Sequence, residues 1–160
     1  FSVAEIFSLS NDIEWIQGHP VVVDEAGRYV YQRPPVYTPD HFLSKKYHDG
    51  RFIQQESTFW RRSLWEKAGG YINTELKFAG DFELWMRFFG HAQMYLSSAM
   101  LGAFRTRSSG QISKEQYSGY LSECDAIVDR KPERDLHIQS PVRKTISYHF
   151  GKNIFYIENQ

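Results

Sequence analysis

Hydrophobic residues recur along this chain at two spacings, which together predict a mixture of short strands and helices. Alternating or β-branched apolar residues predict strands over 13–17, 21–23, 28–32, 52–57, 94–96 and 101–105. Apolar residues three or four positions apart predict helices over 1–10, 57–68, 81–89 and 114–129. Short strands mixed with helices, without long strand–helix–strand repeats, indicate a mixed α/β or α+β fold.

A further helix is predicted at the C-terminal end of the chain. Pro141 suits the first turn of a helix, where its missing N–H costs nothing. Four apolar residues then follow at helical spacing and form one stripe: Ile146, Phe150, Ile154 and Ile157.

Composition predicts an ordered domain without an electrostatic preference for polyanions. The chain has 160 residues, of which 41% are hydrophobic and 16% aromatic, enough to form a core. Lys and Arg number 19, as do Asp and Glu, so the formal net charge is zero. Charge therefore gives no reason to propose a nucleic acid or an anionic membrane as partner.

Cysteine and histidine usage excludes the commonest metal and disulfide architectures. Cys124 is the single cysteine, so neither an intrachain disulfide nor a cysteine-based zinc site can form. A lone cysteine weakly favours a reducing compartment. The six histidines show no spacing typical of metal ligands, so no metal site is predicted from these residues. No apolar run approaches the roughly 20 residues that span a bilayer.

Asp81 is the first candidate for chemistry, because it follows Gly80 and opens a predicted helix. One interpretation is N-capping, in which the carboxylate accepts free backbone N–H groups and favours the helix dipole. The other is a general base, which needs a carboxylate held in a fixed place. Glu83 and Arg87 are four residues apart and predict a surface ion pair on that helix.

Two further polar groups are candidate ligand contacts. In a strand, Gln54 and Glu56 would share one face and Gln55 the other, either as a solvated edge or as hydrogen-bonding groups for sugar hydroxyls. Arg105 and Arg107 would also share a strand face. Paired guanidinium groups can bind a diphosphate, although pairing with nearby carboxylates is the simpler interpretation.

Three stretches together resemble a known family. Residues 54–71 have the sequence QQESTFWRRSLWEKAGGY, residues 80–88 the sequence GDFELWMRF, and residues 104–107 the sequence FRTR. They closely resemble the second half of bacterial family 2 glycosyltransferases, over about residues 1–113. The resemblance implies the C-terminal part of a GT-A fold, a mixed sheet flanked by helices, with 114–160 as a helical C-terminal extension.

The resemblance also implies an activity and roles for the candidate residues. The family transfers a sugar from a nucleoside diphosphate sugar to a glycan or glycolipid acceptor with inversion, and its general base corresponds to Asp81. By the same likeness, Gln54, Gln55, Glu56 and Trp85 would lie beside the sugar or acceptor, and Arg105 and Arg107 beside the diphosphate. The family often has His where Arg107 stands, and Arg cannot ligate a metal.

Cofactor, partners and location follow from the same likeness. The family uses a divalent cation, Mg²⁺ or Mn²⁺, and its ligands are expected mostly outside this chain, in an N-terminal half that would also hold the nucleotide. We therefore expect a fragment that is inactive alone and self-associates through an exposed sheet edge. A cytoplasmic location, at the inner face of the membrane, would serve polysaccharide synthesis for the cell envelope.

Two interpretations from other classes stay open at this point. The four tryptophans and ten tyrosines could form stacking platforms in a noncatalytic carbohydrate-binding or assembly module. The chain could also be a structural α/β interaction domain, in which capping is the only role of Asp81.

Overall fold

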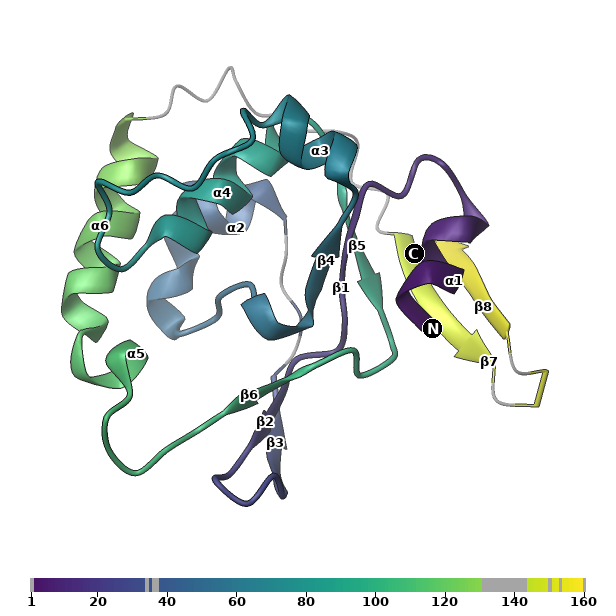
Figure 1. Ribbon diagram of the computed structural model, residues 1–160, viewed down its shortest axis with the longest axis horizontal. Coiled ribbons are helices and arrows are strands. Elements are labelled where there is room, and N and C mark those ends of the chain that lie inside the picture. Colours follow the sequence, from purple (N-terminus) through teal and green to yellow (C-terminus); the bar gives the residue numbers. More distant parts are fainter. Residues whose placement is uncertain are drawn as a thin grey trace.

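The computed structural model describes residues 2–33, 35, 38–130, 144–149, 151–152 and 154–159. These residues form two β-sheets flanked by helices, which confirms the predicted mixed α/β class (Figure 1). The helices are α1 (Ser2–Leu9), α2 (Pro39–Leu43), η1 (Lys46–Asp49), η2 (Gln55–Ser57), α3 (Arg62–Lys67), α4 (Gly80–Phe89), α5 (Ile112–Glu115) and α6 (Tyr117–Arg130), where η denotes a 3₁₀ helix. The strands are β1 (Trp15–Gln17), β2 (Val21–Val23), β3 (Tyr29–Gln32), β4 (Thr58–Trp60), β5 (Met94–Ser97), β6 (Ala103–Arg105), β7 (Lys144–His149) and β8 (Ile154–Asn159).

The larger sheet has five strands in the order β4-β1-β5-β7-β8. Its central strand β5 runs parallel to both β1 and β7, whereas β4 and β8 are antiparallel to their neighbours. Successive residues of β1 face opposite sides of this sheet because strand side chains alternate. Trp15 therefore enters the core shared with α4 and α6, and Ile16 enters the core that contains Ile6 of α1.

Aromatic side chains dominate the first core. The indole of Trp15 stacks on that of Trp85 with ring centroids 5.9 Å apart, and it meets Phe88 and Phe89 edge-on at 5.3 and 4.9 Å. Such pairs add to the apolar area that the rings bury. They attach α4 firmly to the middle of the sheet, so the first turn of α4 has a defined position relative to the strand ends.

The smaller sheet, in the order β3-β2-β6, continues from the larger one (Figure 1). The chain passes from β1 to β2 and from β5 to β6, and both β1–β5 and β2–β6 are parallel pairs. Glycines allow the close approaches at this crossing. A Cβ atom on Gly102 would lie 2.0 Å from the carbonyl oxygen of Glu56, and one on Gly18 would lie 2.7 Å from the backbone nitrogen of Leu101.

The prediction of a C-terminal helix is wrong, because β7 and β8 form a hairpin that extends the larger sheet. Ile146 is fully buried and Phe155 is 6% exposed, whereas Ile154 and Ile157 are 46% and 36% exposed. The apolar stripe is therefore not one face. Pro141 and Phe150 lie outside the described residues. Of the expected helical extension over 114–160, α6 is confirmed.

The strand predicted over 52–57 is also wrong. Residues Gln55–Ser57 form the 3₁₀ helix η2, and the strand β4 begins only at Thr58. The carbonyl oxygen of Gln54 accepts hydrogen bonds from Ser57 N at 3.1 Å and Thr58 Oγ1 at 2.8 Å, which close this turn. The helix predicted from residue 57 or 58 accordingly starts later, at Arg62. In the part of the chain that the structure describes, no helix combines the length and apolarity needed to cross a membrane.

The close approach at Gly102 predicts a stability effect. Gly102→Ala places a methyl group against the backbone of Glu56, so we expect the free energy of unfolding to fall by about 3 kcal/mol. Urea denaturation measures it, with the exposed Ser109→Ala as control. If Gly102→Ala is as stable as Ser109→Ala, the backbone segments at Gly102 and Glu56 can move apart at little cost in free energy.

Edge strand β3 is the basis of a prediction of self-association. Its Tyr29, Val30 and Tyr31 side chains are 61%, 47% and 42% exposed, and among the described residues it pairs with β2 alone. We expect concentration-dependent dimers by light scattering, weakened in Val30→Lys because a charged edge disfavours strand pairing. Met100→Lys, which replaces an exposed apolar residue outside the strands, is the control. Monomers at every concentration would contradict this prediction.

Candidate functional site

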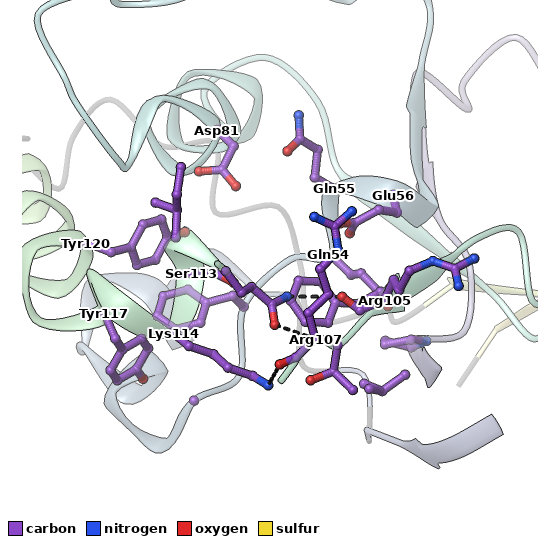
Figure 2. Close-up of a pocket in the computed structure, with 18 of the residues that line it drawn as sticks. Gln54, Gln55, Glu56, Asp81, Arg105, Arg107, Ser113, Lys114, Tyr117 and Tyr120 are labelled. Atoms are coloured by element: carbon purple, nitrogen blue, oxygen red, sulfur yellow. Dashed lines mark hydrogen bonds between the residues drawn. The ribbon is translucent and has the colours of Figure 1, made fainter. Parts of the chain in front are cut away.

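A cavity of about 800 Å³ opens where the smaller sheet meets the helices (Figure 2). Its wall includes the residues around η2, the first turn of α4, β6 and its continuation, α5 and the start of α6, and residues of β2 and β3 also contribute. Of the predicted site residues, this cavity brings together Gln54, Gln55, Glu56, Asp81, Arg105 and Arg107.

Asp81 lies in the first turn of α4, and its carboxylate points toward the open centre of the cavity, between Tyr120 and Gln55 (Figure 2). Its Oδ1 accepts the N–H of Phe82 at 2.7 Å. The N-cap position is held by Ala79, not by Asp81, and Ala79 has no side chain that can cap. Asp81 is therefore not the N-cap residue, although its carboxylate satisfies a backbone N–H group in the first turn of α4.

The cap comes from a residue that is distant in sequence. The carboxylate of Glu123 on α6 accepts the N–H groups of Lys77, Phe78 and Ala79 at 3.0, 2.9 and 2.8 Å. These are free backbone donors just before and at the start of α4, which otherwise lack partners. Glu123 thus satisfies the donors that lead into α4, while Asp81 accepts the N–H of Phe82 inside the first turn and also borders the cavity.

The environment of Asp81 raises its pKa. Burial, the largest cause, disfavours the charged form, and the nearby charge of Glu56 acts in the same direction. The N–H of Phe82 and the hydroxyl of Tyr120 oppose this by favouring the carboxylate, but the pKa of Asp81 stays above its usual value. A carboxylate with a raised pKa in a cavity is a stronger base than an exposed one, and suits proton abstraction near neutral pH.

Gln54, Gln55 and Glu56 occupy the opposite wall, although not in the alternating arrangement that was predicted. Because they lie at η2, Gln55 and Glu56 are both exposed on the cavity side. Gln54 donates from Nε2 to the carbonyl oxygen of Val21 at 2.9 Å. Its Oε1 is buried without a hydrogen-bond partner among the described residues, which leaves one acceptor beside the cavity unsatisfied.

Arg105 and Arg107 line the cavity but do not form the predicted pair. Arg105 donates from Nη1 to the carbonyl oxygen of Glu25 at 2.6 Å, so its guanidinium is engaged by the β2–β3 turn. The guanidinium of Arg107 has no hydrogen bond or ion pair within the described residues. The pKa of Glu25 is lowered mainly by hydrogen bonds from Ser108, and less by the charge of Arg107. Arg107 is thus available to an anion in the cavity.

Trp85 is the predicted site residue that the structure places elsewhere. It is 3% exposed, packs against Trp15 and Trp60 in the aromatic core, and does not line the cavity. The expectation that it edges an acceptor pocket is therefore wrong. The predicted pair of Glu83 and Arg87 is confirmed at 2.9 Å, although both side chains are largely buried rather than on the surface.

Sequence reasoning missed several residues of the cavity wall. Tyr117 and Tyr120 of α6 line the cavity, and burial raises the pKa of both hydroxyls. Lys114 donates from Nζ to the carbonyl oxygen of Arg107 at 2.6 Å and so supports the loop that carries it. The sequence signal for these residues was weak, because helical spacing does not separate a core-facing tyrosine from one at a cavity wall.

A divalent cation is not accommodated by the residues at hand. No cluster of three or more His, Cys, Asp or Glu side chains suitable for a metal occurs in the described ranges. The guanidinium of Arg107 has no free lone pair, so it cannot ligate a metal. Comparisons with protein-family models, with curated proteins and with solved structures find no match to this chain.

The raised pKa of Asp81 predicts how stability depends on pH. Because the folded chain holds this proton more tightly than the unfolded chain, stability falls as pH rises through the folded-state pKa. Asp81→Asn mimics the protonated form and can still accept from Phe82 N. We therefore expect the variant to be more stable than the wild type at pH 7, with the difference vanishing below the usual value of 3.8.

Urea titrations at several pH values measure this difference. The exposed Asp12→Asn is the matched control and should not gain stability at pH 7. If the free energy of unfolding of Asp81→Asn is instead lower than that of the wild type by the same amount at all pH values, the carboxylate stabilises the fold. Folding then does not disfavour its ionised form.

Proposed function

We propose that this chain is the acceptor side of an inverting glycosyltransferase of GT-A type. The full protein would transfer a sugar from a nucleoside diphosphate sugar to a glycan or glycolipid acceptor. The observation that carries the proposal is the Asp81 carboxylate, which lies in the first turn of α4 and faces the cavity with a raised pKa. The family resemblance of residues 54–71, 80–88 and 104–107 points to the same reaction.

In the proposed reaction, Asp81 accepts the proton of an acceptor hydroxyl as that oxygen attacks the anomeric carbon. A carbon–oxygen bond forms to the acceptor, the bond from the anomeric carbon to the diphosphate breaks, and the nucleoside diphosphate leaves with the bonding electrons. Attack from the face opposite the leaving group inverts the configuration. The charge of Arg107 would stabilise the departing diphosphate electrostatically.

The polar residues of η2 would orient the sugar or the acceptor. Gln55 and Glu56 present hydrogen-bonding groups on the wall opposite Asp81, where hydroxyls of a bound ring could reach both sides. The divalent cation used by the family would be held mostly by residues outside this chain, so no step here runs through it. An enzyme that uses nucleotide sugars for polysaccharide synthesis would act in the cytoplasm, at the inner face of the membrane.

A noncatalytic carbohydrate-binding module is the second candidate, and the aromatic part of the wall favours it. Phe52, Phe78, Tyr117 and Tyr120 all line the cavity, and rings of this kind can contact the apolar faces of sugars. Such a module would need the aromatic and polar groups of the cavity, but would not need a base. Replacement of Asp81 therefore separates the two candidates.

Asp81→Asn in the full protein is expected to lower turnover by about 100-fold or more, the usual contribution of a general base. Release of nucleoside diphosphate from a panel of nucleotide sugars with a glycan acceptor measures turnover, and calorimetry measures donor binding, which should not change. Asp12→Asn, which replaces an exposed carboxyl group distant from Asp81 in the sequence, is the control. Unchanged turnover in Asp81→Asn would refute the role of base, whereas glycan binding by the wild-type full protein without turnover of any nucleotide sugar would favour the binding module.

A further inference from the structure

One carboxylate outside the cavity wall holds the segment that leads into the candidate base. The Glu123 carboxylate spans three consecutive N–H groups, with Lys77 N on Oε1 at 3.0 Å and both Phe78 N and Ala79 N on Oε2 at 2.9 and 2.8 Å. Burial acts to raise the pKa of Glu123, but these three donors together lower it below its usual range. Glu123 is therefore ionised at neutral pH, and its hydrogen bonds are of the stronger, charge-assisted kind.

The same helix also contacts Asp81 itself. Tyr120 lies one turn before Glu123 on α6, and its ring stands beside the Asp81 carboxylate in the cavity (Figure 2). Residues three apart share a helix face, so the two side chains reach α4 together. Glu123 holds the backbone two residues before Asp81, and Tyr120 faces its carboxylate.

We propose that Glu123 is a positioning residue that fixes the entrance of α4 and so aims the Asp81 carboxylate into the cavity, an inference that rests on the function proposed above. Without Glu123, the three N–H groups at this entrance lose their acceptor, so the backbone that carries Asp81 is held less firmly. Removal of Glu123 would thus let the Asp81 carboxylate leave its fixed, buried position in the cavity wall.

The groups that face Asp81 come from two elements among the described residues. Glu56 of η2 approaches with a negative charge, and Tyr120 and Cys124 of α6 approach with neutral side chains. Burial raises the pKa of both Tyr120 and Cys124, so neither titrates near neutral pH. A change in the titration of Asp81 therefore reports on its own position and on Glu56.

The test combines Glu123→Gln with two readouts that need no substrate. Amide hydrogen exchange should become about tenfold faster or more at Lys77, Phe78 and Ala79, because a neutral amide offers one acceptor in place of two charged oxygens. Carbon-13 titration of the Asp81 carboxyl should show its pKa moving down, toward its usual value, as the carboxylate becomes less buried. In the full protein, turnover should fall about 10- to 100-fold with KM for the donor unchanged.

Asp129→Asn is the matched control, because it removes a carboxylate from the same helix whose partner is Lys45 rather than the α4 entrance. Faster exchange in Glu123→Gln with an unchanged Asp81 titration would overturn the proposal and leave Glu123 as a cap alone. If Glu123→Gln does not fold, Tyr120→Phe provides the second variant. This variant lacks the Tyr120 hydroxyl, which lowers the pKa of Asp81, so that pKa should rise. An unchanged pKa of Asp81 would contradict the inference that α6 positions this carboxylate.

The outcomes separate this inference from the proposed reaction. If Asp81→Asn keeps full turnover while Glu123→Gln shifts the Asp81 titration, the proposed base is wrong and the positioning of the carboxylate stands. If Asp81→Asn loses turnover while Glu123→Gln changes neither the titration nor turnover, the base stands and the positioning role fails.

Discussion

The arrangement of the candidate site depends on three hydrogen bonds, in which backbone N–H groups at the entrance of α4 donate to the Glu123 carboxylate. Every helix begins with backbone donors that need acceptors, and a nearby acidic side chain normally supplies them. Here the acceptor comes from another helix, more than 40 residues further along the chain. The local acidic residue, Asp81, accepts one N–H group of its own first turn and keeps a partly desolvated carboxylate in the cavity.

The cavity itself follows from the way the two sheets are joined. The parallel pair β1–β5 continues into the parallel pair β2–β6, and the glycines at positions 18 and 102 let the crossing segments approach closely. This crossing brings η2 against the start of β6, while the aromatic core fixes α4 on the larger sheet. Carboxylates from η2 and α4 and the cation of Arg107 then line one space, an arrangement suited to a substrate with both hydroxyl and anionic groups.

Much of the fold and part of the site were predictable because they depend on local pattern. The β-branched run Val21–Val23, the spacing of apolar residues in α4 and α6, and the Glu83–Arg87 pair each rest on interactions within a few residues. Six of the seven candidate site residues line one cavity. Their chemistry could be recognised because carboxylate, amide and guanidinium groups are scarce in apolar surroundings and cluster where ligands bind.

The sequence by itself determined the strand and helix periods, the neutral charge, the lack of a cysteine-based site and the presence of an acidic residue at a helix entrance. It did not determine the C-terminal hairpin, since Ile146, Ile154 and Ile157 are compatible with a helical stripe and only pairing of β7 with β5 selects the strand. Nor did it determine that Trp85 is core, that η2 replaces a strand, or that Glu123 caps α4. Those outcomes depend on contacts between residues far apart in the chain, where the energy of tertiary packing and of satisfying buried N–H groups exceeds local preference.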